Sequence, residues 1–387
     1  TQEQKIQADN AGADDEFGNS VGIYGDTIIV GARFEDTTAS NAGSAYVFTR
    51  TGVTWTQQQQ LQADNAALDD NFGWSVAIYG DTVAVAAVSE DTTASASGAI
   101  YIYTRSGATW TQQQMLKASD ADVNDKLGDD ISMHMDTIIA GTRFENASAG
   151  SAYIFTRSGG TWTEEQKLVA SDAAGTDYFG YNVAIHGDTA VIGAYQEDTA
   201  VSGAGSVYIF TRSGVTWTEQ QILRGPAQVA NDQFGYSVAV YGDTIVASAW
   251  REDSGGATDS GAAYIFTRTG VTWTQEERLQ ATAPESSDWF GYSVARHGNA
   301  IAVGAYGDNT TVITAGSVYV YDIGIVPNPG DIIRIWDVLE NSNRIPIKIM
   351  GVNKLIDGES RIFLNNPDKV LQITYVNDTI QWVSIED

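Results

Sequence analysis

The dipeptide Phe-Gly returns at a nearly constant interval, and this repeat constrains the fold more than any other feature of the sequence. The units are centred on Phe17, Phe72, Leu127, Phe179, Phe234 and Phe290, where Leu127 replaces Phe in the third unit. The steps between them are 55, 55, 52, 55 and 56 residues. Long periods of this kind are typical of propellers and solenoids, in which each repeat is one supersecondary unit.

Each unit contains four short apolar runs separated by turn signals. Residues 76–79 alternate and lead to Gly80-Asp81, a two-residue turn typical of β-hairpins. A third run reads Tyr-Ile-Phe-Thr-Arg at residues 208–212, and a fourth contains a Trp such as Trp217. Four short strands without a helical period predict an antiparallel four-stranded sheet in every unit. The recurring Phe and Trp are expected to fill the space between neighbouring sheets.

The two ends of the repeat region predict how these sheets are arranged. A single sheet cannot bury both of its faces, so six copies must stack on one another. Residues 1–10 align without a gap on residues 56–65, just after a Trp position, and the sixth unit stops at Tyr321 without a fourth strand. We therefore predict an all-β, six-bladed β-propeller over residues 1–325, in which the N-terminal segment pairs beside Tyr319 and closes the ring.

These repeats resemble the FG-GAP repeats of integrin α-subunit propellers and of many bacterial and viral surface proteins. The resemblance covers roughly residues 1–325, and it implies a β-propeller with a role in surface recognition. Integrin heads have one blade more, and the family's Asp-x-Asp-x-Asp-Gly calcium hairpins do not occur in this sequence. The family's calcium sites are therefore not transferred to this chain.

The chain is strongly acidic, with 49 Asp and Glu against 21 Lys and Arg and a formal net charge of −28. Such a surface repels phosphate backbones and anionic headgroups, which argues against nucleic-acid and membrane-surface partners. Basic protein patches, cations and neutral sugars remain. No apolar run reaches the roughly 18 residues that a membrane span needs, so we expect no membrane insertion.

Carboxylates recur in two loops of each unit, and the alternation of strand direction places both loops on one face. One Asp stands one or two residues before each Phe-Gly position: Asp15, Asp70, Asp125, Asp177, Asp232 and Asp288. The loop after the second strand adds Glu35, Asp36, Glu197, Asp198, Glu252 and Asp253, with Trp250 beside the last pair. Two interpretations stay open. Each Asp caps its own loop by accepting backbone hydrogen bonds, or the acids form a binding surface for a basic protein or for cations.

One segment is a candidate metal site. Asp120, Asp122 and Asn124 follow the alternating oxygen spacing of a calcium loop, although the Gly and the bidentate Glu of such a loop are missing. Ca²⁺ is thus the one cofactor that the sequence suggests. Aromatic residues after the second strand also suit stacking on sugars, in sites that are weak singly and strengthened by multivalency. They are Phe34, Phe144, Tyr195, Trp250 and Tyr306.

The sequence offers little for catalysis. His134, His186 and His297 fall near turns of different units, with no nucleophile beside them. We expect no enzyme activity. The third unit departs most from the others, because it has Leu127 for Phe and Asp129-Asp130 where the other units have small or aromatic residues. Any functional asymmetry is expected there.

The composition changes after residues 326–330, where Pro327 and Pro329 mark a short linker. Ile-rich alternation over residues 331–387 predicts five short strands in a small β-sandwich-like domain, which is marginal alone. This segment resembles the small β-domains of viral and phage fibre or spike proteins. The resemblance implies attachment to a virion or homo-oligomerisation, and a generic cell-surface module is the alternative.

These features predict a non-enzymatic surface recognition or adhesion protein, extracellular or on a virion surface. In this interpretation it is a fibre, spike or other exposed virion component that binds a host protein or glycan through the acidic propeller face. Three alternatives remain: a secreted or cell-surface bacterial adhesin, a glycan-binding lectin, and a structural decoration subunit without a dedicated ligand.

Overall fold

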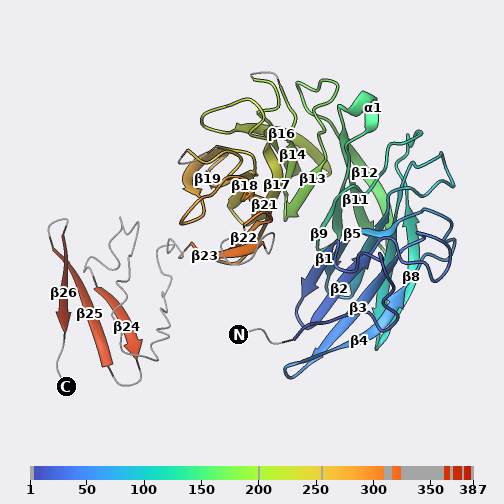
Figure 1. Cartoon of the computed structure of the whole chain (residues 1–387), viewed down its shortest axis with the longest axis horizontal. Helices are drawn as coiled ribbons and strands as arrows, with labels where there is room; N and C mark the ends of the chain where they lie inside the picture. The colour runs from blue at the N-terminus through green and yellow to red at the C-terminus, as the bar shows by residue number, and fades with distance from the viewer. Residues whose placement is uncertain are drawn as a thin grey trace. The chain divides into compact units, whose positions relative to one another are not determined.

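The computed structural model describes residues 4–198, 201–253, 256–308, 316–323, 361–366, 369–376 and 379–384. By its internal contacts the chain divides into two compact units, residues 1–321 and 322–387. The first unit is the predicted all-β, six-bladed β-propeller, made of five four-stranded sheets and one three-stranded sheet. Figure 1 shows the strands of these sheets, which we call blades 1 to 6 in chain order.

Every blade is an antiparallel sheet whose strands pair in sequence order. Blade 1 contains β1 (Val21–Tyr24), β2 (Thr27–Ala32), β3 (Ser44–Thr51) and β4 (Thr54–Leu61). Blade 2 contains β5 (Phe72–Tyr79), β6 (Thr82–Ala87), β7 (Ala99–Ser106) and β8 (Thr109–Leu116). Blade 3 contains β9 (Ile131–His134), β10 (Thr137–Thr142), the four-residue α1 (Glu145–Ser148), β11 (Ser151–Ser158) and β12 (Thr161–Leu168).

The second half of the propeller repeats this order. Blade 4 contains β13 (Asn182–His186), β14 (Thr189–Ala194), β15 (Ser206–Ser213) and β16 (Thr216–Arg224). Blade 5 contains β17 (Phe234–Tyr241), β18 (Thr244–Ala249), β19 (Ala262–Thr269) and β20 (Thr272–Leu279). Blade 6 contains β21 (Phe290–His297), β22 (Ala300–Ala305) and β23 (Ser317–Asp322).

The residues at the tight turns explain why the first hairpin of each blade forms. In blade 1 the pair Tyr24 and Thr27 closes the first hairpin, and Gly25 between them has a φ of 55°. Glycine takes this left-handed conformation without the steric cost that a Cβ atom brings. In blade 3 Met135 occupies the same place with a φ of 54°, so the degenerate repeat keeps the turn at some conformational cost.

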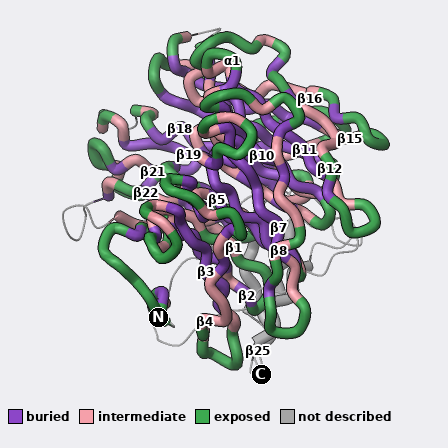
Figure 2. Tube along the Cα trace, turned by 90° about the vertical axis from the view of Figure 1, so that its right-hand side faces the viewer, coloured by how far each residue is buried: buried purple, intermediate pink, exposed green. Residues whose placement is uncertain are grey.

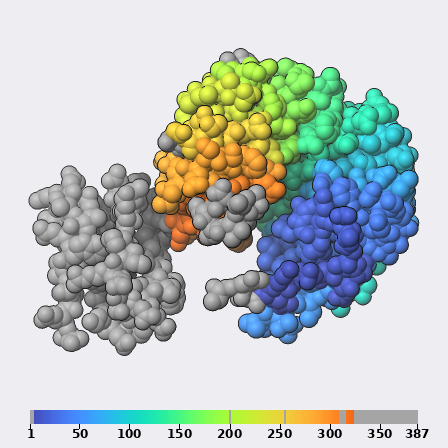
Figure 3. Space-filling model, in the orientation of Figure 1, coloured from blue at the N-terminus to red at the C-terminus, as the bar shows by residue number. Residues whose placement is uncertain are grey.

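Neighbouring blades bury the recurring aromatic residues between them, as the sequence predicts. Phe72 of blade 2 lies in one apolar cluster with Ile29 and Val47 of blade 1, and Phe179 of blade 4 lies in another with Ile139 of blade 3. Burial of one such ring contributes about 1.5–3 kcal/mol. In Figure 2 the strands are mostly buried and the loops mostly exposed. Figure 3 shows the blades following one another in chain order, from blue to orange.

The blades also approach one another at the level of the backbone. A Cβ atom on Gly31 would stand 2.0 Å from the carbonyl oxygen of Gly73 in the next blade, and one on Gly141 would stand 1.8 Å from that of Gly180. Real Cβ atoms do not come so close to an oxygen, so a side chain at these positions forces the blades apart. At these junctions the Gly of Phe-Gly and the Gly of the second strand each leave room for the other's backbone, whereas blades 2 and 5 have Ala86 and Ser248 at the second-strand position.

A backbone hydrogen bond next to this contact joins the loops of successive blades. In blades 2 to 6 the amide of the Phe or Leu before this Gly donates to a carbonyl in the loop between the second and third strands of the preceding blade. The pairs are Phe72 and Ala42 at 2.8 Å, Leu127 and Ser97 at 2.9 Å, Phe179 and Ala149 at 3.0 Å, Phe234 and Ala204 at 2.8 Å, and Phe290 and Ser260 at 2.9 Å. The loop before the first strand of one blade therefore lies beside the loop between the second and third strands of the preceding blade.

The N-terminal segment occupies the place of a fourth strand next to blade 1. The Gln4 side chain donates to the Trp55 carbonyl and accepts from the Trp55 amide, both at 2.8 Å. Gln59 and Trp110 make the same two bonds between blades 1 and 2. The alignment of residues 1–10 with a fourth strand is thus correct for the contact with blade 1.

The predicted closure of the ring beside Tyr319 is not formed by the described residues. Residues 4–8 form no strand, and β23 has no described strand on its outer side. Val21 and Ile23 of blade 1 are 66% and 65% exposed, whereas their counterparts Val76 and Ile78 are 5% and 8% exposed. Each blade packs only on its immediate neighbours, so the junctions between blades 1 and 6 in chain order form without a junction between blade 6 and blade 1. Residues 1–3 lie outside the description.

The second unit contains a three-stranded antiparallel sheet of β24 (Arg361–Asn366), β25 (Lys369–Val376) and β26 (Thr379–Ser384). These strands coincide with three of the five expected after the linker. The other two expected strands and the linker at 326–330 lie outside the described residues. No helix in the described part of the chain has the length and apolar character to cross a membrane.

Substitution of Gly193 tests the backbone contact between blades. A Cβ atom there would stand 2.0 Å from the Gly235 carbonyl oxygen. We expect Gly193→Ala to lower the free energy of unfolding by about 2–4 kcal/mol, measured by urea unfolding with tryptophan fluorescence. Gly225→Ala is the matched control, because its Cβ would meet Phe234 at an ordinary 3.8 Å. Equal stability of the two variants would contradict the close approach.

Candidate functional site: the entry-loop face and the axial pocket

We call the face that bears the loops before each first strand, and the loops between each second and third strand, the entry-loop face. The Asp before each Phe-Gly position is buried within this face. Its carboxylate accepts a hydrogen bond from the backbone N–H three residues earlier. The bonds are Gly12 to Asp15 at 2.5 Å, Ala67 to Asp70 at 2.7 Å, Asp122 to Asp125 at 2.6 Å, Ala174 to Asp177 at 2.7 Å and Glu285 to Asp288 at 2.7 Å. Val229 donates likewise to Asp232. The capping bond is therefore present in every blade.

The acid in the loop after the second strand is also turned inward. Glu35 accepts from the Ser44 hydroxyl at 2.7 Å, and Glu197 accepts from Ser206 at 2.8 Å. In blades 2 to 5 a cation from the end of the fourth strand faces this acid: Lys117 with Glu90, Lys167 with Glu145, Arg224 with Glu197 and Arg278 with Glu252. Our sequence interpretation missed these pairs, although a Lys or Arg beside the last Leu of the fourth strand is a visible signal.

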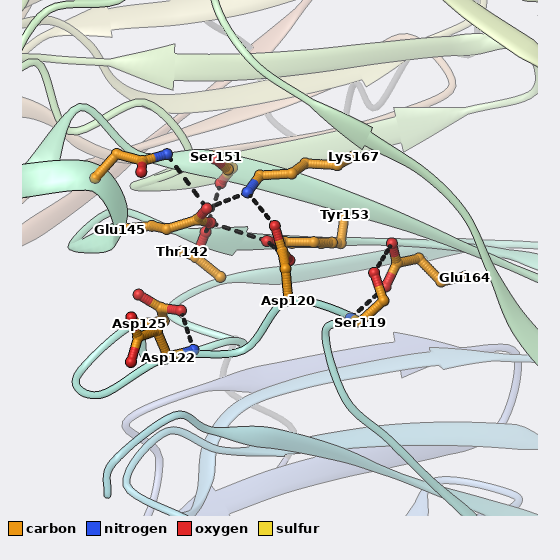
Figure 4. A network of polar contacts seen from close by, with 11 residues as sticks. Ser119, Asp120, Asp122, Asp125, Thr142, Glu145, Ser151, Tyr153, Glu164 and Lys167 are labelled. Carbon is orange, nitrogen blue, oxygen red and sulfur yellow. Dashed lines mark hydrogen bonds and ion pairs between the residues drawn. The ribbon is translucent and has the colours of Figure 1, made fainter. Parts of the chain in front are cut away.

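In blade 3 the candidate metal ligand Asp120 belongs to a network of hydrogen bonds and ion pairs (Figure 4). Asp120 accepts from the Tyr153 hydroxyl at 2.6 Å and from Lys167 at 2.7 Å. Burial acts to raise the pKa of Asp120, but these two donors outweigh it and the pKa is lowered. Lys167 also pairs with Glu145. The carboxylate is thus held inside a protein network.

The other two residues of the suggested calcium loop do not join Asp120. Asp122 accepts from the Val123 amide at 2.7 Å, and its own amide donates to Asp125. Asn124 is exposed and takes a left-handed conformation with a φ of 66°. In the described part of the chain, no group of three or more His, Cys, Asp or Glu residues has an arrangement that suits a metal ion.

The carboxylates that reach solvent are those at the loop tips. Of the candidates from the sequence, Asp36, Asp198 and Asp253 are exposed, whereas Glu35 and Glu197 are buried and Trp250 is 9% exposed. Further exposed acids on these loops are Asp14, Glu16, Asp69, Asp91, Asp122 and Glu285. The entry-loop face therefore has two layers, buried acids that hold the loops and exposed acids at their tips.

The recurring arginines on the opposite face are neutralised by the turn acids. Arg50 pairs with Asp26 at 2.7 Å and Arg212 with Asp188 at 2.7 Å. Each guanidinium also lies over the Trp of its own blade, with 5.2 Å between Arg50 and the Trp55 ring. The positive charge of these arginines is therefore balanced within their own blades.

A pocket lies on the axis of the propeller. Its volume is about 370 Å³, and every blade lines it with residues that follow Phe-Gly. These residues also join the blades: the Ser20 hydroxyl accepts from the Val76 amide at 3.0 Å, and Asn182 accepts from the Val238 amide at 2.6 Å. We call this space the axial pocket. Apart from the unusual Asp129-Asp130 pair, no sequence pattern indicated a cavity here.

The Asp pair of blade 3 lies in the wall of the axial pocket. Burial raises the pKa of Asp129 to about 6, even though Arg143 lies 3.1 Å away and acts in the opposite direction. Burial also raises the pKa of Asp130 to about 6. Asp130 accepts from Asn182 at 2.6 Å and from the Val183 amide at 2.9 Å, so it replaces the Ser that links other blades.

Aromatic rings surround the pocket on the side of blades 4 to 6. Tyr181, Tyr236 and Tyr292 follow Phe-Gly in these blades, and their neighbours lie 4.9 Å and 5.3 Å apart between ring centroids. Of the aromatic residues proposed for sugar stacking, Tyr195, Trp250 and Tyr306 support this row from behind. Phe34 and Phe144 instead contact the guanidinium groups of Arg33 and Arg143.

The three histidines lie at the opposite end of the axis, in a row of aromatic rings. Nδ1 of His134 accepts from the Gly187 amide at 3.1 Å, and Nδ1 of His186 accepts from the Gly242 amide at 3.2 Å. Burial, together with His186, lowers the pKa of His134. His134 and His186 therefore each join their own blade to the next one.

A family model for the FG-GAP repeat matches residues 1–48, 55–103, 110–155, 162–210, 217–266 and 273–321. The matched segments cover well over half of the chain and follow the six blades. The chain belongs to the FG-GAP repeat family. Each match begins at a fourth-strand position and ends in the third strand of the next blade, which agrees with the place of residues 4–10 on blade 1. No curated protein matches the sequence significantly.

Membership in the FG-GAP family fits a propeller that recognises rather than transforms its ligand, because this is in general a non-catalytic fold. FG-GAP repeats are also typical of extracellular proteins.

The pH dependence of stability tests the buried carboxylate Asp130. Its folded-state pKa lies above the ordinary value of 3.8, so its stabilising contribution is present below about pH 4 and is lost as the pH rises through about 6. We expect Asp130→Asn to be more stable than the parent by about 3 kcal/mol at pH 8 and to match it at pH 4. Urea unfolding at both pH values measures this. Asp91→Asn, at an exposed loop tip, is expected to differ little from the parent at either pH. An unchanged pH profile in Asp130→Asn would refute the assignment.

Addition of Ca²⁺ tests whether the acidic loops bind cations. Because Asp120 is bonded to Lys167 and Tyr153, we expect the melting temperature with Ca²⁺ to equal that with EDTA. Differential scanning calorimetry checks this. A rise of more than about 2 °C with Ca²⁺ would show that a site binds the ion preferentially in the folded state.

Proposed function

We propose that this chain is a non-enzymatic surface recognition protein whose entry-loop face binds a basic patch on a partner protein. The observation that carries the proposal is the two-layered arrangement of this face. Exposed carboxylates such as Asp36, Asp198 and Asp253 stand at the tips of loops that buried acids fix from behind. Loops that are already ordered lose less conformational entropy when a partner binds.

The charge distribution supports a basic partner. The chain has a net charge of −28, and the arginines on the opposite face are paired with turn acids. A surface of one sign steers an oppositely charged partner during diffusion and repels like-charged surfaces. In this proposal the exposed acids set the rate of association, and the apolar and polar groups nearer the axis add specificity.

The proposal also places the protein at an exposed surface, either a virion fibre or spike or the outside of a cell. The support is the extracellular character of FG-GAP proteins together with the sequence resemblance of the C-terminal segment to small fibre and spike domains. In this view the unit 322–387 attaches the propeller to a larger assembly or to further copies of the chain.

Cell binding tests the proposal directly. The fluorescently labelled full chain is incubated with a panel of cultured cells, before and after trypsin treatment of the cell surface, and followed by flow cytometry. We expect binding that trypsin and high salt both reduce. Asp36→Lys combined with Asp253→Lys should slow association roughly tenfold, because charges at the rim of an interface act mainly on the association rate.

The matched control carries the same charge change away from the loops. Glu276→Lys combined with Glu277→Lys alters two exposed residues of the outer strand β20. We expect this variant to bind as the parent does. Trypsin-resistant binding, or equal loss in the two variants, would contradict recognition of a protein by the entry-loop face.

A further inference from the structure

The axial pocket has two chemically different halves. On the side of blades 4 to 6 the wall contains Tyr181, Tyr236 and Tyr292 together with one Asn and two Ser side chains. On the side of blades 1 to 3 it contains Arg33 and Arg143 together with Trp74, the pair Asp129 and Asp130, and small polar side chains. A volume of about 370 Å³ lies within the usual range for small-molecule sites, which combine apolar walls with a few fixed polar groups.

The aromatic half is rigid and presents ring surface to the pocket. Tyr236 contacts Tyr181 and Tyr292 and is backed by Trp250, with a centroid distance of 4.9 Å to the latter. Tyr292 is in turn stacked on Tyr306 at 5.1 Å. Tyr292 is 37% exposed, so part of its ring remains free for a ligand. Aromatic rings held in this way offer an apolar surface with little conformational freedom to lose.

The charged half offers hydrogen-bond donors with little net charge. Arg33 pairs with Glu16 at 2.6 Å and lies over the Trp74 ring at 4.4 Å. Arg143 pairs with Asp129 at 3.1 Å and lies over the Tyr181 ring at 4.9 Å. Each guanidinium is thus fixed in position and locally neutralised, while about a quarter of its side chain stays exposed.

This combination fits a ligand with one apolar face and several hydroxyl groups. A simple anion is disfavoured by the acidic surroundings, since the whole chain has a net charge of −28. A simple cation finds Asp129 already paired with Arg143, and Asp130 already bonded to Ser75, Asn182 and the Val183 amide. A neutral polyol stacks on tyrosine and accepts hydrogen bonds from arginine. It is not repelled by the negative charge of the chain, and it does not need a free carboxylate.

We propose that the axial pocket binds one pyranose unit of a neutral glycan, between the tyrosines of blades 4 to 6 and the arginines of blades 1 and 3. The inference rests on the proposed recognition role and names a second ligand class for the same face. It does not depend on the exposed acids at the loop tips, so the two proposals fail separately.

The test uses defined probes and the full chain. Methyl glycosides of glucose, galactose, mannose, fucose and N-acetylglucosamine are titrated with saturation-transfer NMR and tryptophan fluorescence. We expect at least one probe to bind with a dissociation constant of about 1 mM, as its small size implies. Tyr292→Ala should weaken this binding at least tenfold, and Tyr292→Phe, which keeps the ring, should retain most of it.

Controls separate a local effect from misfolding. Tyr24→Ala removes a ring of similar exposure, 43%, from the opposite end of the axis and should bind the probe as the parent does. If Tyr292→Ala fails to fold, Tyr306→Ala serves instead, because this supporting ring is 64% exposed. The Asp36→Lys, Asp253→Lys variant should keep sugar binding even if it loses cell binding.

Three results would overturn the proposal. The first is no saturation transfer to any of the five probes. The second is equal binding by the parent and by the folded Tyr292→Ala or Tyr306→Ala variant. The third is a clear preference for sialyllactose over neutral lactose, which would show that the arginines select an acidic sugar.

Discussion

The contact between the Phe-Gly backbone of one blade and the second strand of the preceding blade determines the rest of the structure. At three of these junctions two glycines face each other, so closely that a Cβ atom on Gly31 or Gly141 would lie within about 2 Å of a carbonyl oxygen, and at the other two the second strand has Ala86 or Ser248. The amide of the Phe residue then reaches the loop of the preceding blade, as between Phe72 and Ala42. One short repeat of residues therefore sets the spacing of the blades and brings both loop sets to one face.

The buried acids of the entry-loop face depend on this geometry. A carboxylate away from water is costly unless it is paired and hydrogen-bonded, and here each one has partners in its own loop or from the fourth strand. Glu145 with Lys167 and Tyr153 is an example. The clusters hold the loops in place from behind, and the carboxylates at the loop tips stay exposed. In this propeller the buried acids maintain the fold, whereas the exposed residues at the loop tips differ in type from blade to blade.

Much of this arrangement is predictable from the sequence, because the same pattern of strands and turns recurs in six units. The strands, the two-residue turns, the buried Phe and Trp, and the shared face of the acidic loops all follow from spacing and alternation. The capping role of residues such as Asp70 was one of two interpretations, and sequence alone did not decide between them, since a buried and an exposed carboxylate look the same in a sequence.

Closure beside Tyr319 was expected from the alignment. The alignment correctly placed residues 4–10 on blade 1, but it cannot establish the pairing on the other side. The axial pocket was missed because residues 55 positions apart, such as Tyr181 and Tyr236, meet only in three dimensions.

Backbone hydrogen exchange of the Phe-Gly amides tests the central claim most directly. If the junction bonds are as described, the amides of Phe72, Phe179, Phe234 and Phe290 exchange as slowly as amides in the middle of β6 and β14. Their protection then vanishes only with unfolding of the propeller. Exchange of these amides at the rate of exposed loop tips would show that the loops of neighbouring blades are not joined, and the account of the entry-loop face would be wrong.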